Sequence, residues 1–318
     1  MSSLVDNIIS GFRIDKNFDY SIFIQSELTE LCENADRIRA VLCGNYVDLC
    51  SIINGKSGKC SENCKFCGQS SHYCTETETY DFLDESKIIN ECRYNAEKGV
   101  NRFSVVTAGR TLSNNDFDKA ISLYQHMSKE KINLCASHGF LTDEQFQKLH
   151  ESGVSRYHCN IETSERFFPQ ICTTHTYADK IDNIKRAKNN GLSVCSGGII
   201  GMGETWADRF DMAVSLAELE IKSIPINFLI PIKNTPLENV TPLNSDDILR
   251  TVAMFRFVNP DTCIRLAAGR KIMKNSGEKV FKSGANSAIT GDMLTTSGNN
   301  IETDIKMLNQ LGFYTKNN

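Results

Sequence analysis

The segment Gly58-Lys-Cys60-Ser-Glu-Asn-Cys64-Lys-Phe66-Cys67-Gly-Gln69 contains three cysteines, separated by three residues and then by two. This spacing lets three thiolates converge on one face of a small loop. A closed tetrahedral zinc site requires four ligands, whereas three suit a four-iron cluster that leaves one iron open for a small molecule. The segment therefore favours an iron–sulfur cluster. A zinc site completed by His72 or Cys74, and a redox pair of Cys64 and Cys67, are the alternatives.

Around this segment, short apolar runs alternate with amphipathic stretches. The runs predict strands at residues 47–53, 102–106, 132–136, 156–161, 193–199, 224–229 and 264–267. Between them, helical patterns cover residues 84–99, 142–153, 178–191 and 245–259, and the second opens with the capping box Thr142-Asp-Glu-Gln145. Strands separated by helices form parallel sheets with right-handed crossovers. The pattern predicts a TIM-type (β/α)8 barrel, with its chemistry at the carboxyl ends of the strands.

Composition and charge limit the classes of protein that the chain can represent. Of its 318 residues, 40% are hydrophobic and 23% are charged, which is ordinary for a globular protein. The formal net charge of −4, without a basic run, argues against a nucleic-acid partner. No apolar stretch approaches the ~18 residues that cross a bilayer, and the N-terminus lacks the pattern of a secretory signal. We therefore expect a cytoplasmic protein without membrane contact, with a helical extension at residues 1–40 and one catalytic domain at residues 41–318.

The chain contains 13 cysteines, an odd number. Without a secretory signal, such a number argues against a disulfide framework, because cytosolic thiols are kept reduced. Metal binding, catalysis or simple burial explains the thiols better. Cys92 shares one face of a predicted helix with Ile88 and Ala96, and Cys32 and Cys263 have no neighbouring ligands in the sequence. We expect these three cysteines to be structural.

The three-cysteine segment, with the aromatic Phe66 directly before its last cysteine, resembles the signature of the radical S-adenosylmethionine (SAM) superfamily. The resemblance implies a 4Fe–4S cluster held by Cys60, Cys64 and Cys67, with SAM bound to the remaining iron through its amino and carboxylate groups. It also implies that an electron from the cluster cleaves SAM to methionine and a 5′-deoxyadenosyl radical. The cofactors carry that chemistry, and the protein positions and shields them.

Seven segments of the chain resemble the biotin synthase family and follow that family's order. They include Val194-Cys-Ser-Gly-Gly-Ile-Ile-Gly-Met-Gly-Glu204 and Ile264-Arg-Leu-Ala-Ala-Gly-Arg270, and the others are residues 64–71, 224–227, 235–237, 284–287 and 294–296. Together they span most of the predicted barrel. The resemblance implies that the chain converts dethiobiotin to biotin by abstracting two hydrogens and inserting sulfur at C6 and C9. The sulfur would come from a second iron–sulfur cluster that is consumed in turnover.

The resemblance also assigns binding roles to residues along the chain. Asn160 and Glu162 match residues that bind the SAM ribose and the substrate, although the family usually has Asp where Glu162 stands. Asn227 matches the residue that hydrogen-bonds the ureido ring of dethiobiotin. The remaining SAM contacts that it implies are Phe66, Thr107, Ile230 and, facing the SAM carboxylate, His175. The remaining substrate contacts are His158 and, facing the valeryl carboxylate, Thr295 and Thr296.

The second cluster is where the chain departs from the family, which usually holds it with three cysteines and an arginine. Cys135, Cys195 and Arg265 match three of these ligands, but the fourth position is Ser104, and serine is a poor iron ligand beside thiolates. The simplest hypothesis is that another thiol replaces the missing ligand. The competing hypothesis is that the second cluster, and sulfur insertion with it, has been lost.

Two cysteines that the family pattern lacks are candidates for the replacement. Cys50 lies on the first predicted strand, near the surroundings of the arginine, and Cys159 stands where the family has histidine. Side chains alternate along a strand, so Cys159 points out of the barrel if Asn160 and Glu162 point into it. We therefore favour Cys50, in a second cluster of altered shape or iron content that need not be the usual 2Fe–2S type.

Two other functions compete with sulfur insertion. One is a related radical SAM enzyme without that step, such as a hydrogenase-maturation or methylornithine-forming enzyme, and retention of Cys135, Cys195 and Arg265 speaks against it. The other is a metal-stabilised binding protein, which is disfavoured because a packed barrel of this length needs no metal for stability. The resemblance to the biotin synthases further implies a flavodoxin- or ferredoxin-type electron donor and a homodimer.

Overall fold

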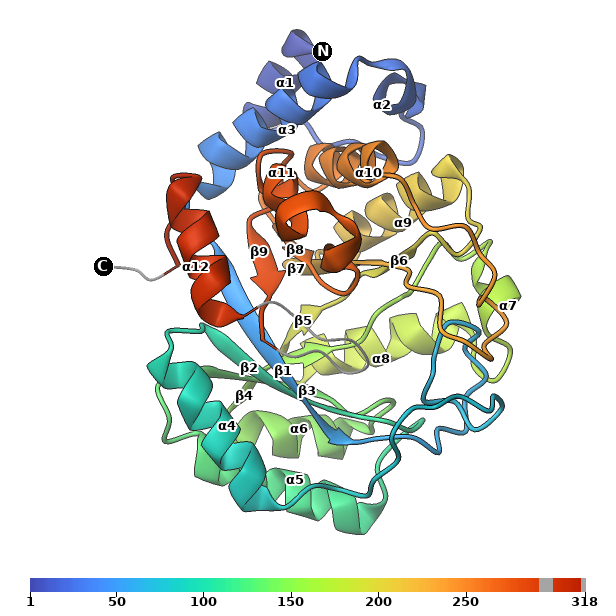
Figure 1. Ribbon diagram of the computed structural model, residues 1–318, viewed down its shortest axis with the longest axis vertical. Coiled ribbons are helices and arrows are strands. Elements are labelled where there is room, and N and C mark those ends of the chain that lie inside the picture. The colour runs from blue at the N-terminus through green and yellow to red at the C-terminus, as the bar shows by residue number, and fades with distance from the viewer. Residues whose placement is uncertain (292–299, 316–318) are drawn as a thin grey trace.

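A closed, parallel β barrel surrounded by helices forms the centre of the protein (Figure 1). The computed structural model describes residues 1–291 and 300–315. Its strands are β1 Asp48–Lys56, β2 Arg102–Thr107, β3 Asn133–Ser137, β4 Val154–His158, β5 Ser193–Cys195, β6 Gly198–Ile200, β7 Ser223–Phe228, β8 Cys263–Leu266 and β9 Ser287–Ile289. Pairing of β9 with β1, and of β5 with β7, closes the ring. Because β5 and β6 are two parts of one interrupted strand, the barrel has eight strand positions.

The predicted (β/α)8 barrel is confirmed, and each of the seven predicted strands overlaps a strand of the barrel. The strand that closes the ring, β9, was missed. It has only three residues, which are all buried, and a run of that length carries no periodicity to read. The predicted strand at residues 156–161 ends earlier, because β4 ends at His158.

Helices follow the strands and cover the outside of the barrel. They are α4 Glu85–Glu97, α5 Asn114–Met127, α6 Asp143–Glu151, α7 Phe168–Ile171, α8 Tyr177–Asn189, α9 Trp206–Glu218, α10 Ser245–Val258, α11 Glu278–Phe281 and α12 Ile301–Gln310, with short 3-10 turns at Arg270–Ile272 and Lys274–Gly277. The predicted capping box at Thr142 is present, and Thr176 and Thr205 form two more. In each box, the threonine hydroxyl accepts a hydrogen bond from a backbone N–H that the helix leaves unpaired.

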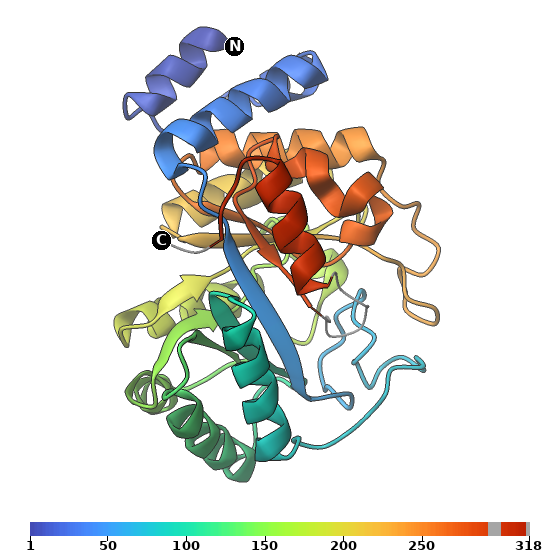
Figure 2. The same cartoon turned by 60° about the vertical axis from the view of Figure 1, so that its left-hand side comes forward.

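Three helices precede the barrel: α1 Ser2–Ile9, α2 Ser21–Gln25 and α3 Leu28–Cys43. Figures 1 and 2 show them together on the outside of the barrel, where α3 contacts α10. The face of α3 that carries Leu31, Ala35 and Ile38 is buried. The first 43 residues therefore bury an apolar face against the helical layer. The division into residues 1–40 and 41–318 stays a prediction.

The interruption between β5 and β6 shapes the interior of the barrel. A Cβ atom on Gly197 would lie 1.9 Å from the carbonyl oxygen of Pro225, and one on Gly198 would lie 2.3 Å from that of Glu162. Only glycines permit this close approach of three chain segments. It brings the residues after β4 against β6, and the N–H of Gly197 donates to Asn160 Oδ1 over 3.1 Å. The glycines thus fix the position of a predicted binding residue.

Candidate active site

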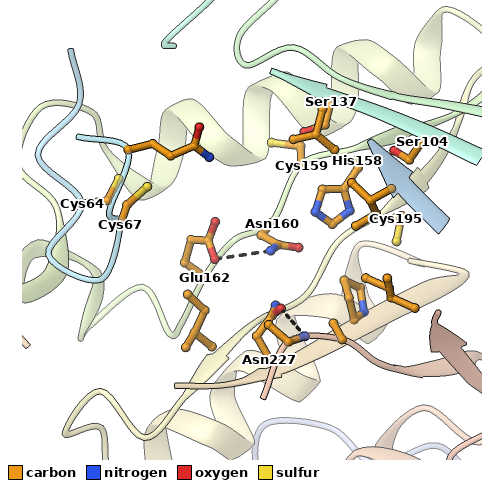
Figure 3. A pocket seen from close by; sticks show the side chains of 18 of the residues that line it. Cys64, Cys67, Ser104, Ser137, His158, Cys159, Asn160, Glu162, Cys195 and Asn227 are labelled. Atoms are coloured by element: carbon orange, nitrogen blue, oxygen red, sulfur yellow. Dashed lines mark hydrogen bonds between the residues drawn. The ribbon is translucent and has the colours of Figure 1, made fainter. Parts of the chain in front are cut away.

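A cavity of about 400 Å³ lies inside the barrel and extends to the loop after β1. It gathers nearly all of the residues singled out by the sequence, and Figure 3 shows several of them around it. Those that line it are Cys50, Cys60, Cys64, Phe66, Cys67, Ser104, Thr107, Cys135, His158, Cys159, Asn160, Glu162, Cys195, Asn227, Ile230 and Arg265. His175 does not line it, and Thr295 and Thr296 lie outside the described residues.

The loop with the three spaced cysteines closes one end of the cavity, where Figure 3 shows Cys64 and Cys67 side by side. Backbone bonds hold the loop: the N–H of Cys60 donates to the carbonyl of Gln69 over 3.0 Å, and the N–H of Cys67 to that of Cys64 over 3.0 Å. The side-chain oxygen of Gln69 accepts from the N–H of Gly58. Burial raises the pKa of Cys67 to about 11, so metal binding must displace a proton there.

A zinc site completed by His72 or Cys74 finds no support in the described residues, where the ligand atoms that lie close together are those of Cys64, Cys172 and His175. His72 places its Nε2 3.0 Å from the carbonyl of Ser61, and Cys74 is exposed. Neither belongs to a group of ligand atoms close enough to hold a metal ion, within the part of the chain that the structure describes. The loop therefore offers three thiols to the cavity, which fits a cluster that leaves one iron to a small molecule.

Behind Cys64 lies a group of polar side chains, of which only His175 was singled out from the sequence. The Cys64 thiol donates to Cys172 Sγ over 3.7 Å, and Cys172 Sγ lies 3.4 Å from His175 Nδ1. That ring nitrogen is 2.5 Å from a carboxylate oxygen of Glu62, which also pairs with Arg110 over 3.3 Å. The structure thus places His175 against Glu62 and the back of the cysteine loop, not in the cavity.

The middle of the cavity is polar. Asn160 Nδ2 donates to Glu162 over 3.4 Å (Figure 3). Burial raises the pKa of Glu162, although the charge of Lys180 and other groups oppose the shift. The backbone of Glu162 has a φ of 70°, in the left-handed region that non-glycine residues rarely adopt. Such strain is characteristic of residues held for a function.

Lys180, at the start of α8, is a cation whose charge acts on Glu162. It was not recognised from the sequence. Its side chain lines the cavity, and its Nζ lies 5.5 Å from the centre of the Phe140 ring. Burial acts to lower the pKa of Lys180, but the charges of Cys159, Glu162 and neighbouring thiols raise it overall. Among the described residues, its ammonium group forms no ion pair within 4 Å. It therefore presents to the cavity a positive charge that no described carboxylate contacts directly.

On the opposite wall, Asn227 is fixed by the backbone. Its Nδ2 donates to the carbonyl of Gly198 over 3.1 Å, and its Oδ1 accepts from the N–H of Ala268 over 3.1 Å. One N–H and one lone pair of the carboxamide stay available to a ligand. The hydroxyl of Thr107 is positioned by a side chain instead, because it lies 3.0 Å from His138 Nδ1.

The far end of the cavity, inside the barrel, contains three buried thiols: Cys50 on β1, Cys135 on β3 and Cys195 on β5. The Cys50 thiol donates to the carbonyl of Ser51 over 3.5 Å, and Cys50 and Cys135 lie close enough to shift each other's pKa. Ser104 is also buried there, paired in register with Cys135. Cys159 differs, because its Sγ accepts from Asn183 on α8 over 3.5 Å. Its thiol is therefore directed between the barrel and the helical layer.

Arginines surround these thiols. Arg265 is 2% exposed, its Nη1 donates to the carbonyls of Asp48 and Ala288, and its Nη2 lies 3.3 Å from the Asp48 carboxylate. Arg102 donates to the same carboxylate over 2.9 Å. Arg156 also lines the cavity. Three guanidinium groups and one carboxylate leave an excess of positive charge beside the thiols.

This charge acts on the thiols. The pKa of Cys135 is lowered to about 7, through the hydrogen bond from Cys50 and then the charges of Arg156 and Arg102, against burial. Burial alone would raise the pKa of Cys195, but a hydrogen bond from His158 and the nearby arginines lower it to about 6. The pKa of Cys50 is raised instead, by its interaction with Cys135 and by burial. Two of the three deep thiols are thus favoured as thiolates, which is the form that ligates iron in an iron–sulfur cluster.

Comparison with known proteins identifies the family. The Radical SAM superfamily model matches residues 56–216, and the Biotin and Thiamin Synthesis associated domain matches residues 225–314. The biotin synthase of Alkaliphilus metalliredigens is 60% identical over 315 residues, covering 99% of both chains. Those of Clostridium beijerinckii and Brachyspira hyodysenteriae are 58% and 51% identical, each over 98% of this chain and over 99% and 94% of their own. The chain belongs to the biotin synthase family.

Membership of the biotin synthase family confirms the predicted enzyme class and function, which is radical SAM insertion of sulfur. A radical SAM domain implies a 4Fe–4S cluster and SAM, and a biotin synthase implies dethiobiotin as substrate and a second iron–sulfur cluster. No helix among the described residues is long and apolar enough to cross a membrane.

Solved structures confirm the fold. A methylornithine synthase superposes with a TM-score of 0.86 over 99% of this chain and 97% of its own, at 18% identity. The FeFe-hydrogenase maturase of Carboxydothermus hydrogenoformans gives a TM-score of 0.82 over 98% and 78%, at 15% identity. Identities this low show a shared barrel and not a shared reaction, so the competing functions gain no support from them.

One cavity residue that was not singled out from the sequence, Arg156, could have been predicted from strand alternation. Arg156 stands two residues before His158 and four before Asn160 on a predicted strand, and alternation puts all three on one face. Lys180 and Cys172 had no such signal. Their positions depend on how α8 and the loop before it pack against the cysteine loop.

Protein of this biotin synthase family member without its clusters should contain Cys195 as a thiolate at neutral pH. We expect its alkylation by iodoacetamide, followed by peptide mass spectrometry, to reach half its maximal rate near pH 6, because the group becomes nucleophilic above its pKa. Cys92, whose pKa burial raises to about 12, is the internal reference and should stay unmodified.

The control for this prediction is His158→Leu, which removes the hydrogen bond that favours the Cys195 thiolate. It should move the half-maximal rate to higher pH. A midpoint near pH 9 in the parent protein would contradict the prediction.

Proposed function

We propose that this chain makes biotin from dethiobiotin with two clusters at opposite ends of one cavity. The observation that carries the proposal is the arrangement of the thiols: one set in the loop after β1, another inside the barrel, and polar side chains between them. When bound, SAM and its cluster supply the radical that abstracts hydrogen, and the second cluster supplies the sulfur. The residues of the chain bind, orient and shield these groups.

At the loop end, Cys60, Cys64 and Cys67 would hold the 4Fe–4S cluster. Support comes from their spacing and from their common position at the cavity. Phe66, Thr107, Asn160, Glu162 and Ile230 line the space between this loop and the barrel, and we assign them to SAM. A buried Glu162 would accept hydrogen bonds from ribose hydroxyls, since a carboxylate has acceptor capacity beyond its bond with Asn160.

We assign the SAM carboxylate to Lys180 in place of His175. The family resemblance implies this role for His175, but the ring of His175 bonds to Glu62 and lies outside the cavity lining. Lys180 lines the cavity near Glu162 and has no ion-pair partner among the described residues. An ammonium group in that position would pair with an anionic ligand group. His175 would instead support the cysteine loop from behind.

Dethiobiotin would lie between the SAM site and the deep thiols. His158, Asn160 and Asn227 face this part of the cavity (Figure 3). The free N–H and lone pair of the Asn227 carboxamide suit a ureido group, which has both a donor and an acceptor. Contacts of Thr295 and Thr296 with the valeryl carboxylate stay predictions.

The second cluster would be held by Cys50, Cys135, Cys195 and Arg265. Cys50 is preferred to Cys159 as the replacement ligand because Cys50 lines the deep end of the cavity, where it and Cys135 shift each other's pKa, whereas the Cys159 thiol accepts from Asn183 on α8. The cluster type is left open, since a ligand on β1 in place of one on β2 changes the shape of the site. A flavodoxin- or ferredoxin-type electron donor, a homodimer and a cytoplasmic location stay predictions as well.

The test of the function is direct. Anaerobically reconstituted protein, given dethiobiotin, SAM and a reductant, should form biotin together with methionine and 5′-deoxyadenosine, measured by liquid chromatography and mass spectrometry. The Cys64→Ala variant should form none of these products. If the parent cleaves SAM but makes no biotin, the chain does not insert sulfur and the proposal fails.

Cys50→Ala and Cys159→Ala form a matched pair that tests the second cluster. Cys50→Ala should lose iron and sulfide of the second cluster and keep the Mössbauer signal of the SAM cluster, because it removes a thiolate ligand. Cys159→Ala should keep both signals. A Cys50→Ala spectrum identical to that of the parent would refute the assignment of Cys50.

Lys180→Met should weaken SAM binding by about 10- to 100-fold, which corresponds to the loss of one charge-assisted hydrogen bond of ~1.5–3 kcal/mol. Equilibrium dialysis with labelled SAM on cluster-loaded protein measures the effect. Lys185→Met, at an exposed position of the same helix, is the matched control and should bind SAM normally. If Lys180→Met binds SAM as tightly as the parent, the assignment of the SAM carboxylate to Lys180 is wrong.

A further inference from the structure

Arg156, at the deep end of the cavity, has a buried N–H donor group without a hydrogen-bond acceptor among the described residues. It lies on β4, in register with Cys135 on β3 and with Ser193 on β5. Its side chain is 8% exposed and lines the cavity. Its Nε donates to Ser193 Oγ over 3.2 Å, but its Nη1 is buried and has no hydrogen-bond partner among the described residues. A charged donor without an acceptor is costly in a protein interior.

Arg265 also has a buried terminal nitrogen without a hydrogen-bond partner, but that nitrogen lies 3.3 Å from the Asp48 carboxylate, so Arg156 still differs from the other buried arginines of the described chain in its acceptors. Each of those donates to at least one carboxylate or carbonyl oxygen; they are Arg39, Arg209, Arg256, Arg265 and Arg270. The one carboxylate close to the thiols, Asp48, is already shared by Arg102 and Arg265. Within residues 1–291 and 300–315, no acceptor is present for this Nη1, and an anionic ligand in the cavity would supply one.

The groups next to Arg156 are sulfur ligands. Cys135 is its register partner on one side, and on the other side Cys195 pairs with His158, two residues along the same strand. The charge of Arg156 acts on both thiols. A cluster held by these thiols would bring negatively charged sulfur close to the guanidinium group of Arg156. Hydrogen bonds to cluster sulfur are a recognised means of setting the reduction potential.

We propose that Arg156 donates N–H···S hydrogen bonds to the second cluster and stabilises its reduced, more anionic form. This inference rests on the proposed function, because it requires the second cluster at Cys135 and Cys195. The bond to Ser193 holds the guanidinium group by its Nε, and Ser193 in turn donates to the carbonyl of Ser155 over 3.0 Å. Arg156 is thus a cluster contact distinct from the ligand Arg265, with Ser193 as its positioning residue.

The test compares Arg156→Gln, Arg156→Lys and Ser193→Ala in protein loaded with both clusters. The readouts are the midpoint potential of the second cluster, from an EPR-monitored redox titration, and the sulfide content per chain. Arg156→Gln should disfavour one-electron reduction about tenfold, which is a shift of about 59 mV to more negative potential. Arg156→Lys, which keeps the charge without the planar donor group, and Ser193→Ala should give smaller shifts in the same direction.

Two internal references make the result specific. The SAM cluster in each variant should keep the potential of the parent. Arg110→Gln removes a guanidinium group beside Glu62, near the loop cysteines, and should leave the second cluster unchanged. An Arg156→Gln protein that keeps the SAM cluster but fails to retain the second cluster supports the inference, because the acceptor has lost its donor.

Three outcomes would overturn the inference. One is a second cluster in Arg156→Gln with the potential and sulfide content of the parent. Another applies if Arg156→Gln retains neither cluster. In that case, second-cluster potentials equal to that of the parent in both Arg156→Lys and Ser193→Ala reject the contact. The last is a parent protein that binds only the SAM cluster, which rejects the proposed second cluster and this inference together. The first two outcomes leave the proposed function intact.

Discussion

Arg265 and Asp48 form an ion pair inside the barrel, and both the closure of the sheet and the deep thiol site depend on it. Arg265 on β8 donates to the backbone of β1 and of β9 and lies 3.3 Å from the Asp48 carboxylate. Burial would raise the pKa of Asp48, but the charges of Arg265 and Arg102 hold it below its usual value. Loss of one partner from such a buried pair leaves an unpaired charge, at a cost of about 3–5 kcal/mol. The pair therefore ties the last strands of the barrel to the first.

The same charges help to make the thiols at the two ends of the cavity chemically different. At the loop end, burial raises the pKa of the Cys67 thiol, although backbone N–H groups act against the shift. At the deep end, hydrogen bonding with Cys50 and with His158, followed by the charges of nearby guanidinium groups, lowers the pKa of Cys135 and Cys195 respectively. Sulfur in the deep site is stabilised as an anion, and the polar side chains of Asn160 and Asn227 line the space between. A substrate there would have access to both ends.

Much of the framework was predictable because it depends on local patterns. The capping box at Thr142 marks a helix start by a bond between residues three apart, and the structure contains it. The alternation of strands and helices was sufficient for the barrel. The short strand β9 was not predicted because its three residues carry no pattern of their own. It forms a strand through its pairing with β1 and β8. The position of Asn160 likewise depends on Gly197 and Pro225, which come from other strands.

The sequence by itself determined the cysteine loop and the family, because a ligand spacing of three and two residues and the matching segments are local properties of the chain. It also indicated that Cys50 and Cys159 differ in direction, since side chains alternate along a strand. Only the tertiary structure determined that Lys180 lines the cavity, that His175 bonds to Glu62 behind the loop, and that Arg156 lies beside the deep thiols without an acceptor. These facts depend on contacts between strands and helices far apart in the chain, and a linear pattern does not encode which charges meet in the closed barrel.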